Sequence, residues 1–354
     1  MQRLSRAGAA AAVAAVALLC AGSALAANTA TIAVSFTPPT LGSSTTALIH
    51  VAVPQTTDPI AAINIYTGTK IVNVAAAPNT QIGSVTATAF AHDAGLNLPL
   101  SGPVMTDDPA KHTADACSPG TNQAVWNMNL TAAGQTLVLP IYVNQTTGAQ
   151  TALGAYDLRI CLPPWDVPVG TPGRAFDGAQ LLDAQLSLSK ILVAPTSAGV
   201  GSYETLFTPY TPGKGTPNPA GTFEARAIVP LPATITAKAT YSKKTKKVTV
   251  TGKATLAGTA LAAGTSLTLY RGTSAKSLKK ATTVHVGSGG SWKLTAKLTG
   301  KKTTYFQAGG AQGERDDTAA GCQSPLPPTA APGGCVSATL SAWSTRSAVV
   351  HVKP

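Results

Sequence analysis

Apolar and polar residues alternate with a period of two through the stretch from Leu231 to Lys302. Every second residue is apolar in ITAKATY, residues 235–241, and VTVTGK, residues 248–253, repeats the alternation after a turn rich in lysine. Successive side chains of a β-strand point to opposite faces of a sheet, so this period indicates strands with one buried face. GSGG, residues 287–290, supplies the tight turn of a later hairpin. The stretch therefore predicts antiparallel β-structure.

The first half of the chain shows the same short alternating runs, separated by turns rich in proline, glycine and asparagine. No run has a helical apolar period longer than one or two turns, and residues 176–184 come nearest to an exception. Short strands at regular intervals are typical of Greek-key and jelly-roll sandwiches. We therefore predict an all-β protein made of two antiparallel β-sandwich domains.

The first 26 residues have the features of a signal peptide. Arg3 and Arg6 precede a run of alanine, valine and leucine that ends in Ala24-Leu25-Ala26, a small-x-small cleavage signal. This run is short for the roughly 20 strongly apolar residues of a spanning helix, and no later run reaches that length. We expect a secreted, extracellular protein, including association with the cell wall, and no membrane span after signal cleavage.

Four cysteines remain once the leader, which contains Cys20, is removed. They are Cys117, Cys161, Cys322 and Cys335. An even count in an exported chain, with no Cys-x-x-Cys pair to hold zinc, predicts two disulfides. Sequence alone allows three connectivities. We favour the pairing of neighbours, Cys117 with Cys161 and Cys322 with Cys335, because each bridge then stays inside one predicted domain.

Charge divides the mature chain into two regions. Residues 27–231 carry a net charge of −4 and residues 232–354 a net charge of +14. We therefore predict a signal peptide (1–26), an N-terminal β-sandwich domain (27–231) and a basic domain (232–354). A basic surface on an exported protein suits an anionic partner such as a cell-wall polymer or a surface glycan, with no specific nucleic acid expected. The alternative is that the lysines only fill the solvent face of the sheets and protect their edges.

Six lysines are the candidates for anion binding. They are Lys243, Lys244, Lys246, Lys247, Lys301 and Lys302. The first four share one turn, where like charges repel one another, so a reason other than stability is expected for their presence there. Lysines on the polar phase of strands, such as Lys238, Lys253 and Lys297, fit the alternative instead.

Candidate chemistry in the first half is sparse. One loop holds the acidic and imidazole groups of Asp107, Asp108, His112 and Asp115, which are types that ligate calcium or zinc. Their spacing matches neither the calcium-loop pattern nor HExxH, so a solvated loop without a metal is the prediction. Trp165, in LPPWDVP, is the aromatic residue expected to be exposed and able to stack on a ligand.

An enzyme is not indicated. The chain has no Gly-x-Ser-x-Gly, HExxH, phosphate-binding loop or dinucleotide fingerprint, and it contains three glutamates in all. We predict a non-catalytic protein without a cofactor.

The last third of the chain carries an ordered set of motifs. VTVTGKATLAG is followed by GSGGSWKLTAKL, then by KKTTYFQAGG and finally by TRSAVVHVKP. In this order they resemble the bacterial immunoglobulin-like modules found as repeats in secreted and surface proteins. The resemblance implies a seven-stranded sandwich that acts as a spacer, an adhesive or a wall-associated module, without catalytic residues. The long segment between Cys322 and Cys335 departs from such modules. The N-terminal region shows no such resemblance.

Two functional hypotheses follow from the sequence. The first is a structural or adhesive protein of the cell surface whose basic module associates with anionic envelope polymers. The second is a carbohydrate-binding accessory protein that uses Trp165 and its neighbours.

Overall fold

The computed structural model describes residues 28–68, 73–74, 76–132, 134–298, 300–322 and 335–354. The predicted signal peptide lies outside these residues. Strands make up 57% of the structure and helices 7%, which confirms the prediction of an all-β protein. Among the described residues, none of the helices has the length and apolar character that crossing a bilayer requires.

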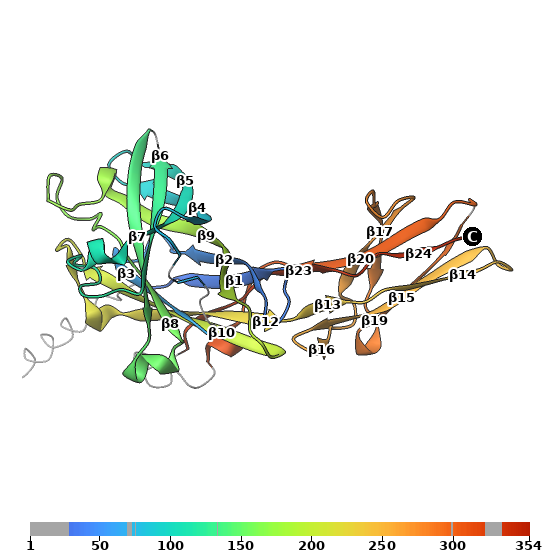
Figure 1. Ribbon diagram of the computed structural model, residues 1–354. Helices are drawn as coiled ribbons and strands as arrows, with labels where there is room; N and C mark the ends of the chain where they lie inside the picture. Colours follow the sequence, from blue (N-terminus) through green and yellow to red (C-terminus); the bar gives the residue numbers. More distant parts are fainter. Residues whose placement is uncertain (1–27, 69–72, 75, 133, 299, 323–334) are drawn as a thin grey trace, which may run out of the picture.

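One large sheet forms the first part of the molecule (Figure 1). Within the described residues its strands run in the order β1 (Thr31–Thr37), β2 (Ser44–Ala52), β9 (Ala179–Val193), β4 (Gln81–Ala91), β5 (Leu96–Asp107), β6 (Ala124–Ala132), β7 (Gln135–Gln145), β8 (Tyr156–Cys161), β3 (Ile60–Thr67), β10 (Gly199–Thr211), β12 (Phe223–Leu231), β22 (Ser337–Leu340) and β21 (Arg315–Asp316), with β11 (Thr216–Pro217) paired to β10.

The large sheet curls so that its two ends meet. The backbone N–H of Val34 on β1 donates a hydrogen bond to the hydroxyl of Ser341, one residue after β22 (3.0 Å). The rings of Phe36 on β1 and Tyr203 on β10 also lie 6.4 Å apart. The enclosed face holds the apolar phase of the strands, including the fully buried Trp126. The core of the first part is therefore the inside of this curl.

Two smaller sheets form the second part. One contains β13 (Ala233–Ile235), β14 (Lys238–Ser242), β15 (Lys247–Leu256), β16 (Thr259–Ala260) and β19 (Ser291–Lys297). The other contains β17 (Ser266–Gly272), β18 (Lys279–His285), β20 (Thr304–Gln312), β23 (Trp343–Arg346) and β24 (Val350–Val352). Val248 and Val250 from the first sheet share one core with Leu267, Leu269 and Phe306 from the second.

The short helices lie between strands. They are η1 (Pro109–His112), η2 (Gly148–Ala152), η3 (Phe176–Gly178), η4 (Pro219–Gly221), η5 (Ser288–Gly290) and α1 (Thr318–Gly321). Residues 176–184, whose apolar period comes nearest to a helix, form η3 and the start of strand β9 instead. Pairing of β9 with both β2 and β4 outweighs the local pattern there.

Gly252 explains one of the motifs in the second part. It lies directly opposite Trp292 in the pairing of β15 with β19. A Cβ atom at Gly252 would lie 2.7 Å from carbons of the indole ring, which is closer than packed atoms approach. The glycine of Val-x-Val-x-Gly therefore leaves room for the buried tryptophan of Gly-x-Trp.

The chain returns to the first part after it has entered the second. Strands β21 and β22 and helix α1 belong to residues 315–340, inside the range 232–354 that charge assigned to the basic domain, yet β22 pairs with β12 of the large sheet. This pair is parallel, which corrects the expectation of purely antiparallel sheets. Alternation fixes which face of a strand is buried and not which strand it joins, so SATL at 337–340 gave no sign of this partner.

Both disulfides that we favoured are present. Cys117 is bonded to Cys161 and Cys322 to Cys335. The first links the loop before β6 to the end of β8, across the intervening strand β7. The second joins Cys322, directly after α1, to Cys335, which lies shortly before β22. The predicted pairing is therefore confirmed.

Candidate functional site

The turn between β14 and β15 lies at the far end of the second part, beside the C-terminus (Figure 1). The backbone N–H of Leu298, at the end of β19, donates to the carbonyl of Lys246 in this turn (2.9 Å). Lys301 follows Leu298 by three residues, which span at most about 11 Å of extended chain. The structure thus brings Lys301 and Lys302 to the same end as the turn lysines, and we call this end of the molecule the lysine end.

Strand pairing adds Lys297 to the lysine end, because it lies directly opposite Lys247 on β15. Further along β15, Thr251 lies between Lys238 on β14 and Lys293 on β19, so these two lysines continue the basic surface away from the turn. From the sequence, Lys297 was expected on an ordinary solvent face, and Lys293 was not among the candidate residues. Their grouping depends on strand register, which the alternation alone does not reveal.

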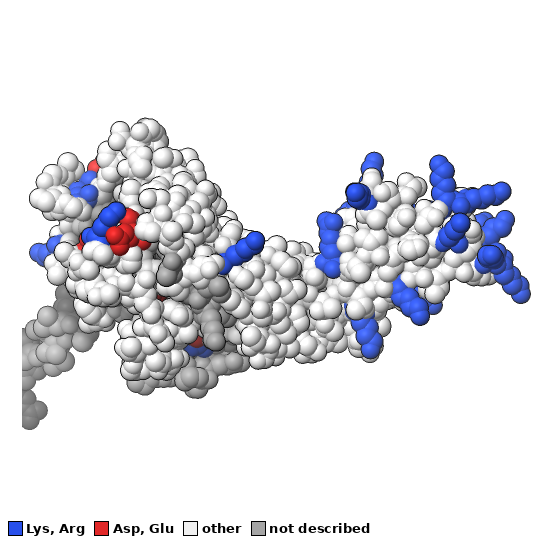
Figure 2. Space-filling model, in the orientation of Figure 1, with Lys and Arg blue, Asp and Glu red and all other residues white. Residues whose placement is uncertain are grey.

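No acidic residue balances these charges nearby. Thirteen lysines and Arg271 lie between residues 232 and 313, whereas no aspartate or glutamate does. The three acidic residues of the predicted basic domain are Glu314, Asp316 and Asp317, in the segment that returns to the large sheet. Among the described residues, none of the lysines of the second part makes an ion pair. In the view of Figure 2, Lys and Arg side chains project from this end with no Asp or Glu beside them.

Like charges placed directly opposite on paired strands destabilise a sheet. The Lys247 and Lys297 pair, together with a turn that contains Lys243, Lys244 and Lys246, therefore lowers the stability of the second part in the absence of counter-ions. An anionic partner would remove this repulsion. The arrangement is chemically suited to holding a chain of negative charges by many weak, salt-sensitive contacts.

The loop that holds Asp107, His112 and Asp115 is a closed hydrogen-bond network. His112 Nδ1 lies 2.7 Å from Asp115 Oδ2 and His112 Nε2 lies 3.1 Å from Asp107 Oδ2. Burial lowers the pKa of His112, but hydrogen bonds to Asp115 and Asp107 outweigh it and raise this pKa above its ordinary value. Asp108 accepts from the N–H of Ala110 and caps η1. Both imidazole nitrogens are thus engaged, and the described residues contain no group of three ligands that could hold a metal ion.

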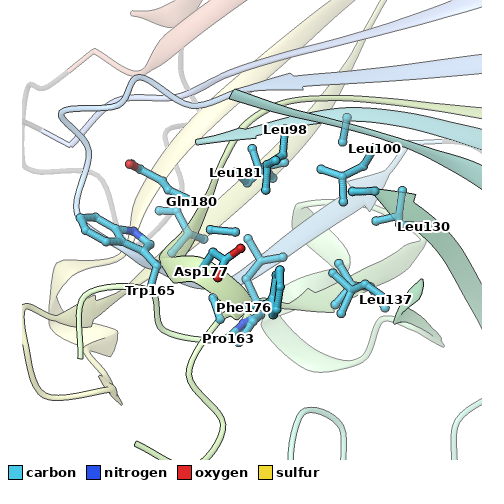
Figure 3. Close-up of a pocket in the computed structure, with 18 of the residues that line it drawn as sticks. Leu98, Leu100, Leu130, Leu137, Pro163, Trp165, Phe176, Asp177, Gln180 and Leu181 are labelled. Carbon is cyan, nitrogen blue, oxygen red and sulfur yellow. The ribbon is translucent and has the colours of Figure 1, made fainter. Parts of the chain in front are cut away.

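Trp165 lines a cavity in the first part (Figure 3). Its indole stacks on the imidazole of His92, with ring centroids 3.8 Å apart and planes within 4° of parallel. His92 is held in turn by Gln180, at 2.9 Å from Nε2 to Oε1. One face of the indole is therefore already occupied by the protein itself.

The returning segment is fixed by a buried ion cluster on β10 and β12. Arg226 Nε donates to Glu204 Oε2 (2.8 Å), its Nη1 donates to the carbonyl of Ala320 on α1 (3.2 Å), and its Nη2 lies 3.5 Å from Glu224 Oε1. All three charged residues are less than one tenth exposed. Burial, followed by the neighbouring Glu204, raises the pKa of Glu224 to about 9, so this carboxyl is neutral at pH 7.

A second contact to the returning segment involves His50 on β2. Its Nδ1 lies 2.7 Å from Glu314 Oε2 and its Nε2 lies 2.6 Å from Asp183 Oδ2. The hydrogen bond to Glu314 raises the pKa of His50 most, burial opposes it, and Asp183 adds to the rise, which brings the pKa to about 9. At neutral pH a charged imidazole therefore joins two carboxylates.

Both groups make stability depend on pH in the same direction. His50 and Glu224 have ordinary pKa values of 6.5 and 4.5 and reach about 9 in the folded protein, so the folded state keeps protons that the unfolded chain loses. This stabilisation is complete below the unfolded pKa values and is lost as pH rises through 9. We expect the free energy of unfolding, measured by urea titration, to fall between pH 6.5 and pH 9.

The control for this pH dependence is the double variant His50→Gln/Glu224→Gln, in which the decline with pH should become shallower. A free energy of unfolding that stays constant or increases over this interval would contradict the assignment.

Comparison with known proteins identifies no family. No known protein family and no curated protein matches the chain. The crystal structure of a tetra-tandem repeat in the extending region of a large adhesion protein aligns with 90% of this chain and 74% of its own, at 12% identity and a TM-score of 0.23. A β-1,2-glucanase from Parabacteroides distasonis aligns with 85% of this chain and 30% of its own, at 10% identity and a TM-score of 0.18. At these TM-scores the similarity supports no conclusion about fold or function.

Proposed function

We propose that this is a secreted, non-catalytic structural or adhesive protein whose second part is an immunoglobulin-like sandwich that binds anionic polymers of a cell envelope. The observation that carries the proposal is the lysine end. Its lysines are drawn together by the β14–β15 turn and by the register of β15 with β19, and they make no ion pair with any described residue. Repulsion among them is a cost to folding that binding of a polyanion would offset.

The distribution of charge also suits this role. The acidic residues of the basic half of the sequence are Glu314, Asp316 and Asp317. They belong to the segment that returns to the large sheet, where Glu314 contacts His50. The second part is therefore uniformly basic, while the first part has carboxylates and cations in pairs such as Asp93 with Arg174. A molecule built in this way can hold its first part away from an anionic surface while the lysine end contacts it.

The test is binding of inorganic polyphosphate to the mature chain at rising salt concentration. We expect the logarithm of the association constant to fall linearly with the logarithm of the salt concentration. The variant Lys243→Ser/Lys244→Ser/Lys246→Asn/Lys247→Thr should make this slope less steep by about 3. Each of the four lost phosphate contacts contributes about 0.7 to 0.9 to the steepness. Asn is chosen at 246 because this residue has a φ of 52°, which asparagine tolerates.

A matched control removes the same charge elsewhere. The variant Lys214→Ser/Lys276→Ser/Lys279→Ser/Lys280→Ser loses four lysines outside the turn, and its slope should change by less than half as much. Equal slopes for the two variants would show that net charge alone drives binding. Absence of any salt-dependent binding by the unaltered chain would refute the proposal. Isolated cell walls should then give the same ranking of variants in a sedimentation assay.

The carbohydrate-binding alternative has less support. One face of the Trp165 indole is covered by His92, and leucine and alanine side chains outnumber the six polar ones that line the cavity beside it. Sugar hydroxyl groups need polar partners when they are buried. The arrangement around Trp165 suits another kind of ligand.

A further inference from the structure

A cavity of about 470 Å³ opens between one end of strands β4 to β7 and the segment 162–181 that crosses them. This volume lies within the range of small-molecule sites, about 300 to 1,000 Å³. Small side chains such as Ala87 and Ala89 contribute to its wall and leave this space open.

The walls of the cavity are apolar. Most of the side chains that line it are Leu98, Leu100, Leu130, Leu137, Leu139, Leu162 and Leu181, with alanines, Pro163 and Phe176. Phe176 and Leu137 are 67% and 42% exposed, so apolar surface continues to the rim. Figure 3 shows Trp165 at one edge and Leu130 and Leu137 at the other, with Asp177 and Phe176 between them. The body of a ligand held here must be apolar.

Six polar side chains line the cavity, and two of them are carboxylates: Asp58, Gln135, Thr136, Arg174, Asp177 and Gln180. Arg174 is neutralised by Asp93, to which it donates two hydrogen bonds of 2.8 Å. Asp58 and Asp177 add two carboxylates to the lining. Asp58 accepts a hydrogen bond from Asn28 (2.9 Å), whereas the Asp177 carboxylate accepts none within the described part of the chain. The site therefore carries net negative charge and one half-buried carboxylate that can accept from a ligand.

We propose that this cavity binds a small apolar molecule that carries one cationic group, such as an alkyl or aryl amine, with its apolar body among the leucines and its ammonium group at Asp177. Charge complementarity selects this class. A fatty acid would bring a third carboxylate to Asp58 and Asp177, and a sugar would leave hydroxyl groups against leucine.

The test compares dodecylamine, dodecanol and dodecanoate, which share one alkyl chain and differ in the charge of the head group. Binding to the mature chain is measured by calorimetry below the micellar concentrations. Dodecylammonium should bind about tenfold more tightly than dodecanol, as expected for one charge pair near a surface, and dodecanoate should bind more weakly than either. This order is informative because the net charge of the whole protein is positive and would favour the opposite one.

Two variants locate the binding. Asp177→Asn should remove the preference for the amine over the alcohol, and asparagine tolerates the φ of 49° at this position. Ala89→Phe fills the cavity and should abolish saturable binding of both. Asp316→Asn, on β21, removes the same charge outside the cavity and should change nothing.

Several outcomes would overturn the proposal. These are the absence of saturable binding by any alkyl compound, dodecanoate binding at least as tightly as dodecylamine, or affinities that Ala89→Phe does not change. Saturable binding of maltopentaose that Ala89→Phe abolishes would assign the cavity to sugars instead. None of these results bears on the lysine end, which lies in the second part of the molecule.

Discussion

Replacement of Arg226 with leucine is expected to lower the free energy of unfolding by about 3 to 5 kcal/mol, because it leaves the buried Glu204 carboxylate without its cation. The same change removes the hydrogen bond to the carbonyl of Ala320, which attaches α1 to the large sheet. Urea unfolding at pH 7 measures the effect. We expect the loss to be cooperative, since the cluster joins strands β10 and β12 to the returning segment.

Glu224→Gln is the matched control for the Arg226 variant. Glu224 is neutral at pH 7 because its pKa is raised to about 9, and glutamine keeps its shape. The variant should therefore change the free energy of unfolding by less than about 1 kcal/mol at pH 7. Above pH 9 it should be more stable than the unaltered protein, in which this carboxyl then becomes charged. A Glu224→Gln variant as unstable as Arg226→Leu would show that the cluster holds two ionised carboxylates.

Removal of the Cys117–Cys161 disulfide has a comparable expected effect. The bridge closes a loop with a sequence separation of 44, and loop-closure entropy predicts that Cys117→Ala/Cys161→Ala costs about 4 kcal/mol. This loop contains β6 and β7 of the large sheet, so the unfolded chain gains freedom over a substantial part of the first core. Urea unfolding of the oxidised double variant measures the loss.

The second disulfide provides the comparison. Cys322 and Cys335 have a sequence separation of 13, so Cys322→Ala/Cys335→Ala should cost about 3 kcal/mol on the same model. The larger loss should belong to the Cys117–Cys161 pair. A loss below about 1 kcal/mol for that pair would mean that the reduced, unfolded chain keeps residual structure that already restricts the loop.

Much of the fold could be predicted from local pattern. The residues on the apolar phase of the strands, such as Val248 and Val250 on β15 and Leu267 and Leu269 on β17, are completely buried. Alternation is a reliable guide here because each of these two strands has one face on a core and one that is more exposed. Residues 176–184, the nearest exception to the strand pattern, form the short helix η3 and the start of strand β9.

The candidate site was only partly accessible from the sequence. Four of its lysines are consecutive or nearly so and were evident as a cluster. Lys297 was assigned to the solvent face of a strand, because nothing local indicates that it lies opposite Lys247. The cavity beside Trp165 was not foreseen, since its leucines come from four strands and a crossing segment and meet only after the sheet has curled.

The sequence by itself determined the all-β character of the protein, the faces of its strands, the excess of lysine in its second half and the presence of two disulfides. Only the tertiary structure decided that residues 315–340 return to the large sheet through a parallel pair, which places Asp316 and Asp317 away from the lysine end. It also decided that an apolar cavity opens beside Asp177. The physical reason is that side-chain alternation specifies which face of a strand is buried. The choice of neighbouring strand depends on contacts between residues far apart in the chain.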